Sequence, residues 1–170
     1  ILGMQSIAKR FSAPPFHDAE HVYLPAARQF LEQGWSFLLS TESYRVVPLA
    51  YLWPALWQAK AEWIRTANCA LWISCVFLLW SMTRRMGGIR CAMLASVLFI
   101  SHRELPRYIA TELTEPIFLF GMFAWFWGLS RIWISEGASK SVVAATGLAL
   151  TITLLSRPVL QLIAPAALFF

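Results

Sequence analysis

The sequence predicts an all-α fold: a multi-pass transmembrane helical bundle with an interfacial helix in its first outer loop. Three observations predict it. The 170 residues have a mean hydropathy of +0.58 and only 14% charged residues, so one soluble core of this size could not bury their apolar surface. Apolar runs close to membrane-spanning length recur after residue 63. Basic residues gather in the short turns between these runs.

Residues 13–62 form the predicted first outer loop. Between Ala19 and Gln33 the apolar residues recur at helical spacing, and Gly34 can end the helix. Aromatic residues such as Trp35 follow at what would be headgroup depth, which is typical of a helix lying in the membrane interface. Residues 46–59 are too short to span and contain two prolines, which predicts a re-entrant or surface-lying segment.

Residues 63–170 are expected to hold about four transmembrane spans. The clearest is 66–83, which is uncharged and bounded by arginines. The next apolar run, 91–101, would have to continue to about residue 110 to cross a bilayer. The third and fourth spans are predicted at 116–135 and 141–156.

The short turns predict the orientation. Turn 84–90 carries three arginines and no acid, and turn 131–140 carries two cations and one acid, so both are placed in the cytoplasm. The loop 13–62 and the stretch 101–116 then face the other side. The cations are scattered between apolar segments and form no basic stripe, which argues against a nucleic-acid partner.

The pentapeptide "HDAEH", residues 17–21, matches the H-x-x-E-H pattern of inverted zinc peptidases. Such a site would need a third ligand, for which Glu104 and Glu112 are available. Two other readings remain open: His17 and His21 are ordinary polar interfacial residues, or they help to hold a divalent cation in another kind of enzyme.

Ionisable groups gather at the predicted outer face of the bundle. Because charges near a bilayer are costly, such groups usually face a wet cavity or one another. A fixed cation beside a carboxylate suits phosphate-linked lipid chemistry. The carboxylates are Asp18, Glu20 and Glu115, and the cations are Arg103, Arg107 and Arg157.

Five motifs in this order resemble membrane glycosyltransferases of the C-type fold, most closely the bacterial protein-mannosyltransferase-like and aminoarabinose-transferase-like group. They are "DAEHVYLPAARQFLEQG", "VVPLAYLWPAL", "TRRMGG", "LTEPIFLFG" and "LSRPVL". The resemblance covers about residues 14–170. Family members are several times longer, so residues 1–170 are expected to be the N-terminal part of a single transmembrane glycosyltransferase domain, lacking most or all of its first helix.

The resemblance implies transfer of a sugar from a polyprenyl-phosphate carrier to a hydroxyl group of a lipid, glycan or protein. This reaction would take place on the non-cytoplasmic face of a plasma membrane, and the membrane expected is a bacterial inner membrane. Membrane lipid is therefore a further expected partner. Asp18 or Glu20 would act as general base or position the acceptor. Tyr23 corresponds to the loop tyrosine, and Glu115 matches the acid at a later helix start. Arg103, Arg107 and Arg157 would bind the phosphate.

The chain departs from the family pattern at two places. The family's acid stands four residues before the tyrosine, whereas Asp18 stands five before Tyr23 and Glu20 matches the second acid, so the choice between them stays open. Val46-Val47 precede Pro48 where the aminoarabinose-transferase group has an acid and a lysine. No metal ligand and no certain cofactor are therefore assigned, and a divalent cation remains an open alternative.

A different class of protein would use the same charges. In a membrane transporter or a non-enzymatic membrane subunit they would form a substrate or proton path. An inverted repeat of these spans in the complete sequence would favour the transporter.

Overall fold

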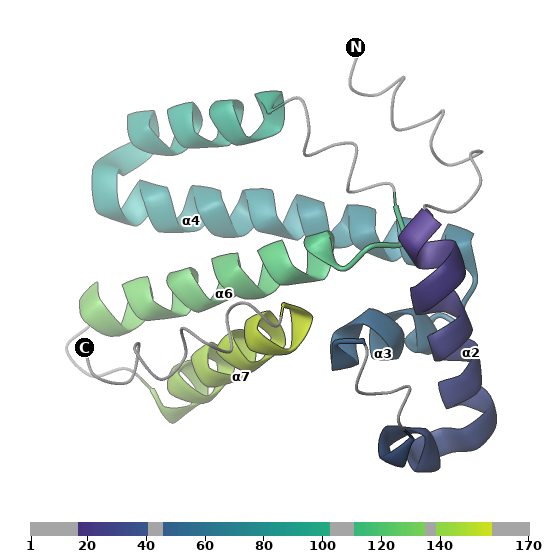
Figure 1. Cartoon of the computed structure of the whole chain (residues 1–170). Helices are drawn as coiled ribbons and strands as arrows, with labels where there is room; N and C mark the ends of the chain where they lie inside the picture. Colours follow the sequence, from purple (N-terminus) through teal and green to yellow (C-terminus); the bar gives the residue numbers. More distant parts are fainter. Residues whose placement is uncertain (1–16, 41–45, 103–110, 135–138, 158–170) are drawn as a thin grey trace.

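The computed structural model describes residues 17–40, 46–102, 111–134 and 139–157, and every regular element within these ranges is helical. The predicted all-α class is confirmed for this part of the chain. Figure 1 shows two regions: a lobe of short helices around α2 and α3, and a stack of longer helices formed by α4, α6 and α7.

The lobe begins with the π-helical turn η1 (Ala19–Tyr23), which continues into α2 (Leu24–Gln33). Gly34 ends α2 with a positive φ of 62°, a conformation that glycine adopts without steric cost, and the 3₁₀-helix η2 (Gly34–Leu39) follows. The helix predicted between Ala19 and Gln33 is therefore present. Residues expected to be re-entrant or surface-lying form the short helix α3 (Pro48–Leu56).

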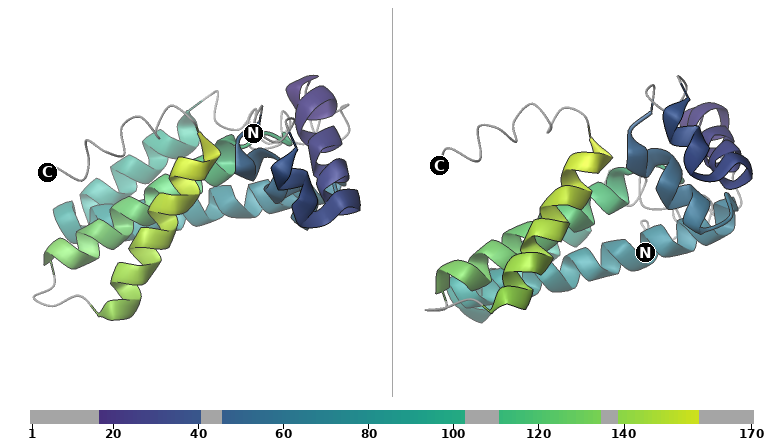
Figure 2. Two further views of the ribbon diagram at one scale, coloured as in Figure 1. Left: turned by 60° about the horizontal axis from the view of Figure 1, so that its bottom comes forward. Right: turned by 90° about the horizontal axis from the view of Figure 1, so that it is seen from below.

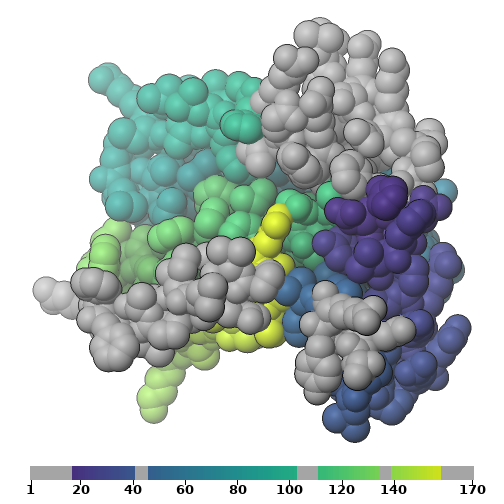
Figure 3. Space-filling view, viewed as in Figure 1, coloured from purple at the N-terminus to yellow at the C-terminus, as the bar shows by residue number. Residues whose placement is uncertain are grey.

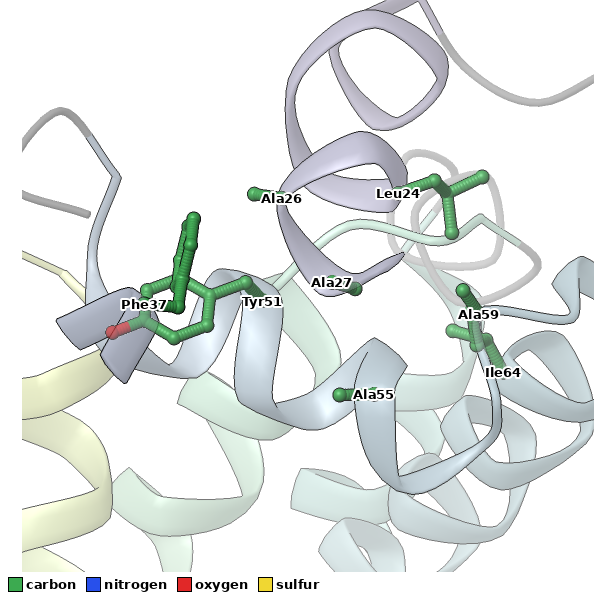
Figure 4. Close-up of a cluster of buried hydrophobic side chains, with 8 residues drawn as sticks. All are labelled: Leu24, Ala26, Ala27, Phe37, Tyr51, Ala55, Ala59 and Ile64. Atoms are coloured by element: carbon green, nitrogen blue, oxygen red, sulfur yellow. The ribbon is translucent and has the colours of Figure 1, made fainter. Parts of the chain in front are cut away.

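A small apolar core holds the lobe together and joins it to the stack. Figure 4 shows this core, in which the rings of Phe37 and Tyr51 meet edge to face at 5.3 Å between centroids. Ile64, near the start of α4, belongs to the same core and is fully buried. The first turns of α4 are thus anchored to the lobe. The buried members are Leu24, Ala26, Ala27, Phe37, Tyr51, Ala55, Ala59 and Ile64.

Helix α4 (Ala61–Ser101) consists of two arms separated at Gly88, whose φ of 77° is not helical. The arms run back along each other in Figure 1. At 1.5 Å per residue the first arm, 61–87, is about 40 Å long, which exceeds the roughly 30 Å of a bilayer's hydrocarbon core. The second arm ends at Ser101, where His102 is extended. The extension to about residue 110 that this run would need to cross a bilayer lies outside the described residues.

Helices α6 (Glu115–Ile134) and α7 (Lys140–Ser156) lie side by side, as both views of Figure 2 show. Small residues line their contact. A Cβ atom added at Gly121 would lie 2.6 Å from the Oγ1 atom of Thr153, and one added at Gly128 would overlap the side chain of Thr146. The two backbones approach so closely because these positions lack a side chain.

Large apolar side chains point outward from the stack. Phe77, Leu98 and Trp133 are 68%, 63% and 86% exposed, whereas Thr146, Ala149 and Thr153 are buried between helices. By length and composition, α4 and α6 are apolar enough to cross a membrane, and α7 is apolar but shorter.

Candidate functional site

A cavity of about 340 Å³ lies where the lobe meets the beginning of α6 and the end of α7. In Figure 3 the purple residues around η1 lie beside the green beginning of α6, and the yellow end of α7 meets the blue α3. Polar groups and valines share the walls. The lining residues are Asp18, Val22, Tyr23, Val46, Val47, Thr114, Ser156 and Arg157. Three residues predicted for the site, Asp18, Tyr23 and Arg157, are among them.

The π-helical turn places Asp18 and Tyr23 on the same side of the chain. In such a turn the backbone hydrogen bond spans five residues, and here the N–H of Leu24 donates to the carbonyl oxygen of Ala19. Residues five apart, such as Asp18 and Tyr23, therefore lie about one turn apart, and both line the cavity. The Asp18 side chain is 65% exposed, so its carboxylate lies at the cavity's open edge.

Arg157 follows the last residue of α7 and pairs with the first residue of α6. Its Nη2 atom donates to Oε1 of Glu115 at 2.6 Å, and its guanidinium carbon lies 5.9 Å from the centroid of the Phe118 ring. The carboxylate also lies in the first turn of α6, where the positive end of the helix dipole stabilises it. Oε2 of Glu115 is buried and accepts no hydrogen bond from the described residues. The pair fixes the cation at the cavity wall.

The charges of Asp18, Glu115 and Arg157 all affect the pKa of Tyr23. Burial raises the pKa of its phenol above the usual value of 10.0, the carboxylates of Glu115 and Asp18 raise it further, and the Arg157 guanidinium lowers it. The four groups thus share one electrostatic environment. At neutral pH the Tyr23 hydroxyl keeps its proton and can donate a hydrogen bond into the cavity.

Glu20, also predicted for the site, is exposed and is not among the lining residues. The predicted phosphate-binding residues Arg103 and Arg107 lie outside the described residues.

His17 and His21 lie four residues apart, and their rings contact each other at a tilt of 38°, with centroids separated by 4.4 Å. Within the described ranges, no three His, Cys, Asp or Glu side chains are placed to hold a metal ion. Of the two candidate third ligands, Glu112 is paired with Arg65 and Glu104 lies outside the described residues. The part of the chain that the structure describes therefore places no third ligand beside the two histidines.

A buried polar network that no sequence motif predicted joins the start of α4 to the segment 111–114, which leads into α6. Arg65, interpreted only as the boundary of a span, is buried and donates from Nε to Oε1 of Glu112 at 2.5 Å. Asn68 lies three residues later on the same helix and donates to the carbonyl oxygen of Thr111 at 2.7 Å. The three-residue spacing of two polar side chains at the start of an apolar helix was the available signal.

A second, larger cavity of about 540 Å³ lies beside the first turns of α4. Its lining residues are Trp57, Glu62, Trp63, Thr66, Ala67 and Ala70. The only charged residue among them is an acid, so this cavity offers a phosphate group no cation. The smaller cavity, which is lined by a carboxylate, a phenol and a guanidinium, is therefore the better candidate for a phosphate-binding site.

Comparisons of the chain with known protein families, with curated proteins and with solved structures give no match. What bears on function is the chemistry of the smaller cavity. A carboxylate, a phenol and a guanidinium line one space. Together they can accept a proton, donate a hydrogen bond and bind an anion.

Proposed function

We propose that this chain belongs to a membrane glycosyltransferase that moves a sugar from a polyprenyl-phosphate carrier to a hydroxyl group of a lipid, glycan or protein on the non-cytoplasmic face. One observation carries the proposal: Asp18 and Arg157, from opposite ends of the described chain, line the same cavity. A base and a phosphate-binding cation are the two groups that this reaction requires.

The chemistry divides between the two sides of the cavity. The acceptor hydroxyl loses its proton as it attacks the anomeric carbon of the sugar, and the Asp18 carboxylate takes that proton. The bond between the anomeric carbon and the phosphate oxygen breaks at the same time. The phosphate leaves with the negative charge, which the Arg157 guanidinium stabilises.

The position of Asp18 supports it as the base in preference to Glu20. The π-helical turn absorbs the one-residue difference from the family spacing, so Asp18 and Tyr23 line the cavity together. Glu20 is exposed away from the lining. Tyr23 can then donate a hydrogen bond to the sugar or to the phosphate.

The distribution of side chains in the helical stack supports a multi-pass membrane bundle. Small and hydroxyl-bearing residues are buried between α6 and α7, and large apolar residues are exposed, which is the arrangement that lipid solvates. With the basic turn 84–90 in the cytoplasm, the cavity lies on the opposite face, which is where a translocated carrier lipid presents its sugar.

Sugar transfer by the full-length protein tests the proposal. Purified protein in detergent receives a radiolabelled polyprenyl-phosphate sugar and a membrane extract as the source of acceptor. We expect label to move to an acceptor, and Arg157→Ala to abolish donor binding while folded protein is still recovered. Arg131→Ala, which removes a cation near the far end of α6 over Trp127, is the matched control and should bind donor normally.

The outcomes separate the alternatives. Donor binding without transfer under any acceptor condition would favour a transporter or a non-enzymatic subunit. If Arg131→Ala and Arg157→Ala impair donor binding equally, the cavity is not the donor site.

A further inference from the structure

The segment 111–114, which leads into α6, has no regular secondary structure, yet it is buried throughout. Thr111, Glu112, Leu113 and Thr114 are between 1% and 5% exposed. Buried backbone and charged groups need partners, since a buried group left without one is strongly destabilising. Among the described residues, the first turns of α4 supply partners for Thr111, Glu112 and Leu113.

Two side chains of α4 hold the segment. Arg65 forms a buried ion pair with Glu112, the two side chains being 4% and 1% exposed. The fully buried Asn68 donates from Nδ2 to the carbonyl oxygens of Thr111 at 2.7 Å and of Leu113 at 3.4 Å. The network therefore binds the backbone of the segment through Asn68 and its Glu112 side chain through Arg65.

The last residue of the segment, Thr114, lines the cavity. Its carbonyl oxygen accepts the first backbone bond of α6, from the N–H of Phe118 at 3.0 Å. The next residue, Glu115, holds Arg157. A shift of the segment would thus move Thr114, Glu115 and Arg157 together.

We infer that Arg65 and Asn68 are positioning residues of the transfer site: from α4 they fix the segment 111–114, and through Glu115 they fix the guanidinium that binds the donor phosphate. The inference rests on the proposed function for its reaction, but the positional link between α4 and Arg157 can be tested without any transfer. Misplacement of reacting groups by about 1 Å can lower a rate by about 100-fold, so such remote residues are expected to affect turnover.

Asn68→Leu is the test variant, because leucine has a similar size and removes both donors to the segment. Its matched control is Trp53→Phe. The Nε1 atom of Trp53 donates to Oδ1 of Asn68 at 2.9 Å, so this change cuts the same network on the side of α3 and leaves the bonds to Thr111 and Leu113 in place. Arg65→Lys is the second variant, which keeps the charge and loses the planar fork.

Two readouts are taken on the monodisperse fraction of each full-length variant. The first is kcat/KM for the donor, expressed per folded molecule. The second is the titration of Tyr23, followed by NMR of ¹³C-labelled tyrosine and assigned with Tyr23→Phe. Burial and the Glu115 carboxylate raise the pKa of Tyr23, and both effects are larger than the lowering by Arg157. Displacement of the segment, which moves Glu115 and Arg157 together, should therefore move that pKa back toward 10.0.

We expect Asn68→Leu to lower kcat/KM by about 100-fold, as for a misplaced reacting group, and to lower the pKa of Tyr23, while Trp53→Phe stays close to wild type in both. If Asn68→Leu yields no folded protein, Arg65→Lys should show the same two changes to a smaller degree. A variant that loses thermal stability but keeps wild-type kcat/KM and Tyr23 titration would overturn the inference, since Asn68 would then only stabilise the fold. If the wild type transfers no sugar, the proposed function fails, and the Tyr23 titration alone decides whether α4 positions the site.

Discussion

Three charged groups near Tyr23, those of Asp18, Glu115 and Arg157, act on its pKa in opposite directions. Removing a carboxylate removes a cause that raises the pKa, so Asp18→Asn and Glu115→Gln should each lower the pKa of Tyr23. Removing the cation removes the cause that lowers it, so Arg157→Ala should raise that pKa further. NMR titration of ¹³C-labelled tyrosine above pH 9 measures both signs. Identical shifts in all three variants would contradict the shared electrostatic environment.

Asp18 lines the cavity and Glu20 does not, although the two residues are only two positions apart. Asp18→Asn keeps the size of the side chain and abolishes its basicity, so it should lower turnover by about 100-fold to 10,000-fold, as loss of a general base does. Glu20→Gln is the control and should remain near wild type, because Glu20 does not line the cavity. Radiolabelled sugar transfer measures both. The opposite ranking would assign the base to Glu20.

The histidines of the same pentapeptide test the alternative chemistry. His17→Ala and His21→Ala should retain transfer, and the purified protein should hold no stoichiometric zinc, since no third ligand is placed beside these rings within the described residues. Metal analysis by mass spectrometry checks the second point. Inactive histidine variants that have lost one equivalent of zinc would favour the peptidase.

Helices α6 and α7 approach each other through Gly128, and this contact can be tested by a single methyl group. A Cβ atom at Gly128 would overlap Thr146, so Gly128→Ala should destabilise the protein by about 1–3 kcal/mol, as overpacking does. Gly147→Ala on α7 is the matched control, because a Cβ atom there meets nothing within 4 Å. Thermal unfolding in detergent compares the two. Equal losses of stability would mean that the close contact is not what Gly128 provides.

The proposed orientation of the whole molecule depends on which ends of the helices meet the cytoplasm. In a background without Cys69, Cys75 and Cys91, Ser36→Cys in the lobe should react with a membrane-impermeant thiol reagent added to intact cells. Arg85→Cys should react only after the cells are opened. Both positions are exposed. Labelling of Arg85→Cys in intact cells would reverse the topology and remove the site from the outer face.

The helices themselves could be predicted because their signals are local. Apolar periodicity and Gly34 placed α2, and the uncharged runs bounded by arginines or by a proline placed much of α4, α6 and α7. The apolar run 91–101 ends where α4 ends, at Ser101, but it is too short by itself to cross a bilayer, so the sequence left its span undecided. Such signals depend on residues close together in the sequence, so they indicate which segments are helical but not how the helices pack.

Asp18, Tyr23, Glu115 and Arg157 were named from residue type and order, but only the tertiary structure decided that they meet. Asp18 lines the cavity with Tyr23 through a π-helical turn, which no characteristic amino-acid pattern announces in the sequence. The pairing of Glu115 with Arg157 depends on how closely α6 and α7 pack. Arg65 and Glu112 pair because a buried charge without an opposite charge is strongly destabilising. The two residues are 47 positions apart, so the sequence alone does not indicate the pair. Sequence determines which groups are available, and packing between distant helices determines which of them share one space.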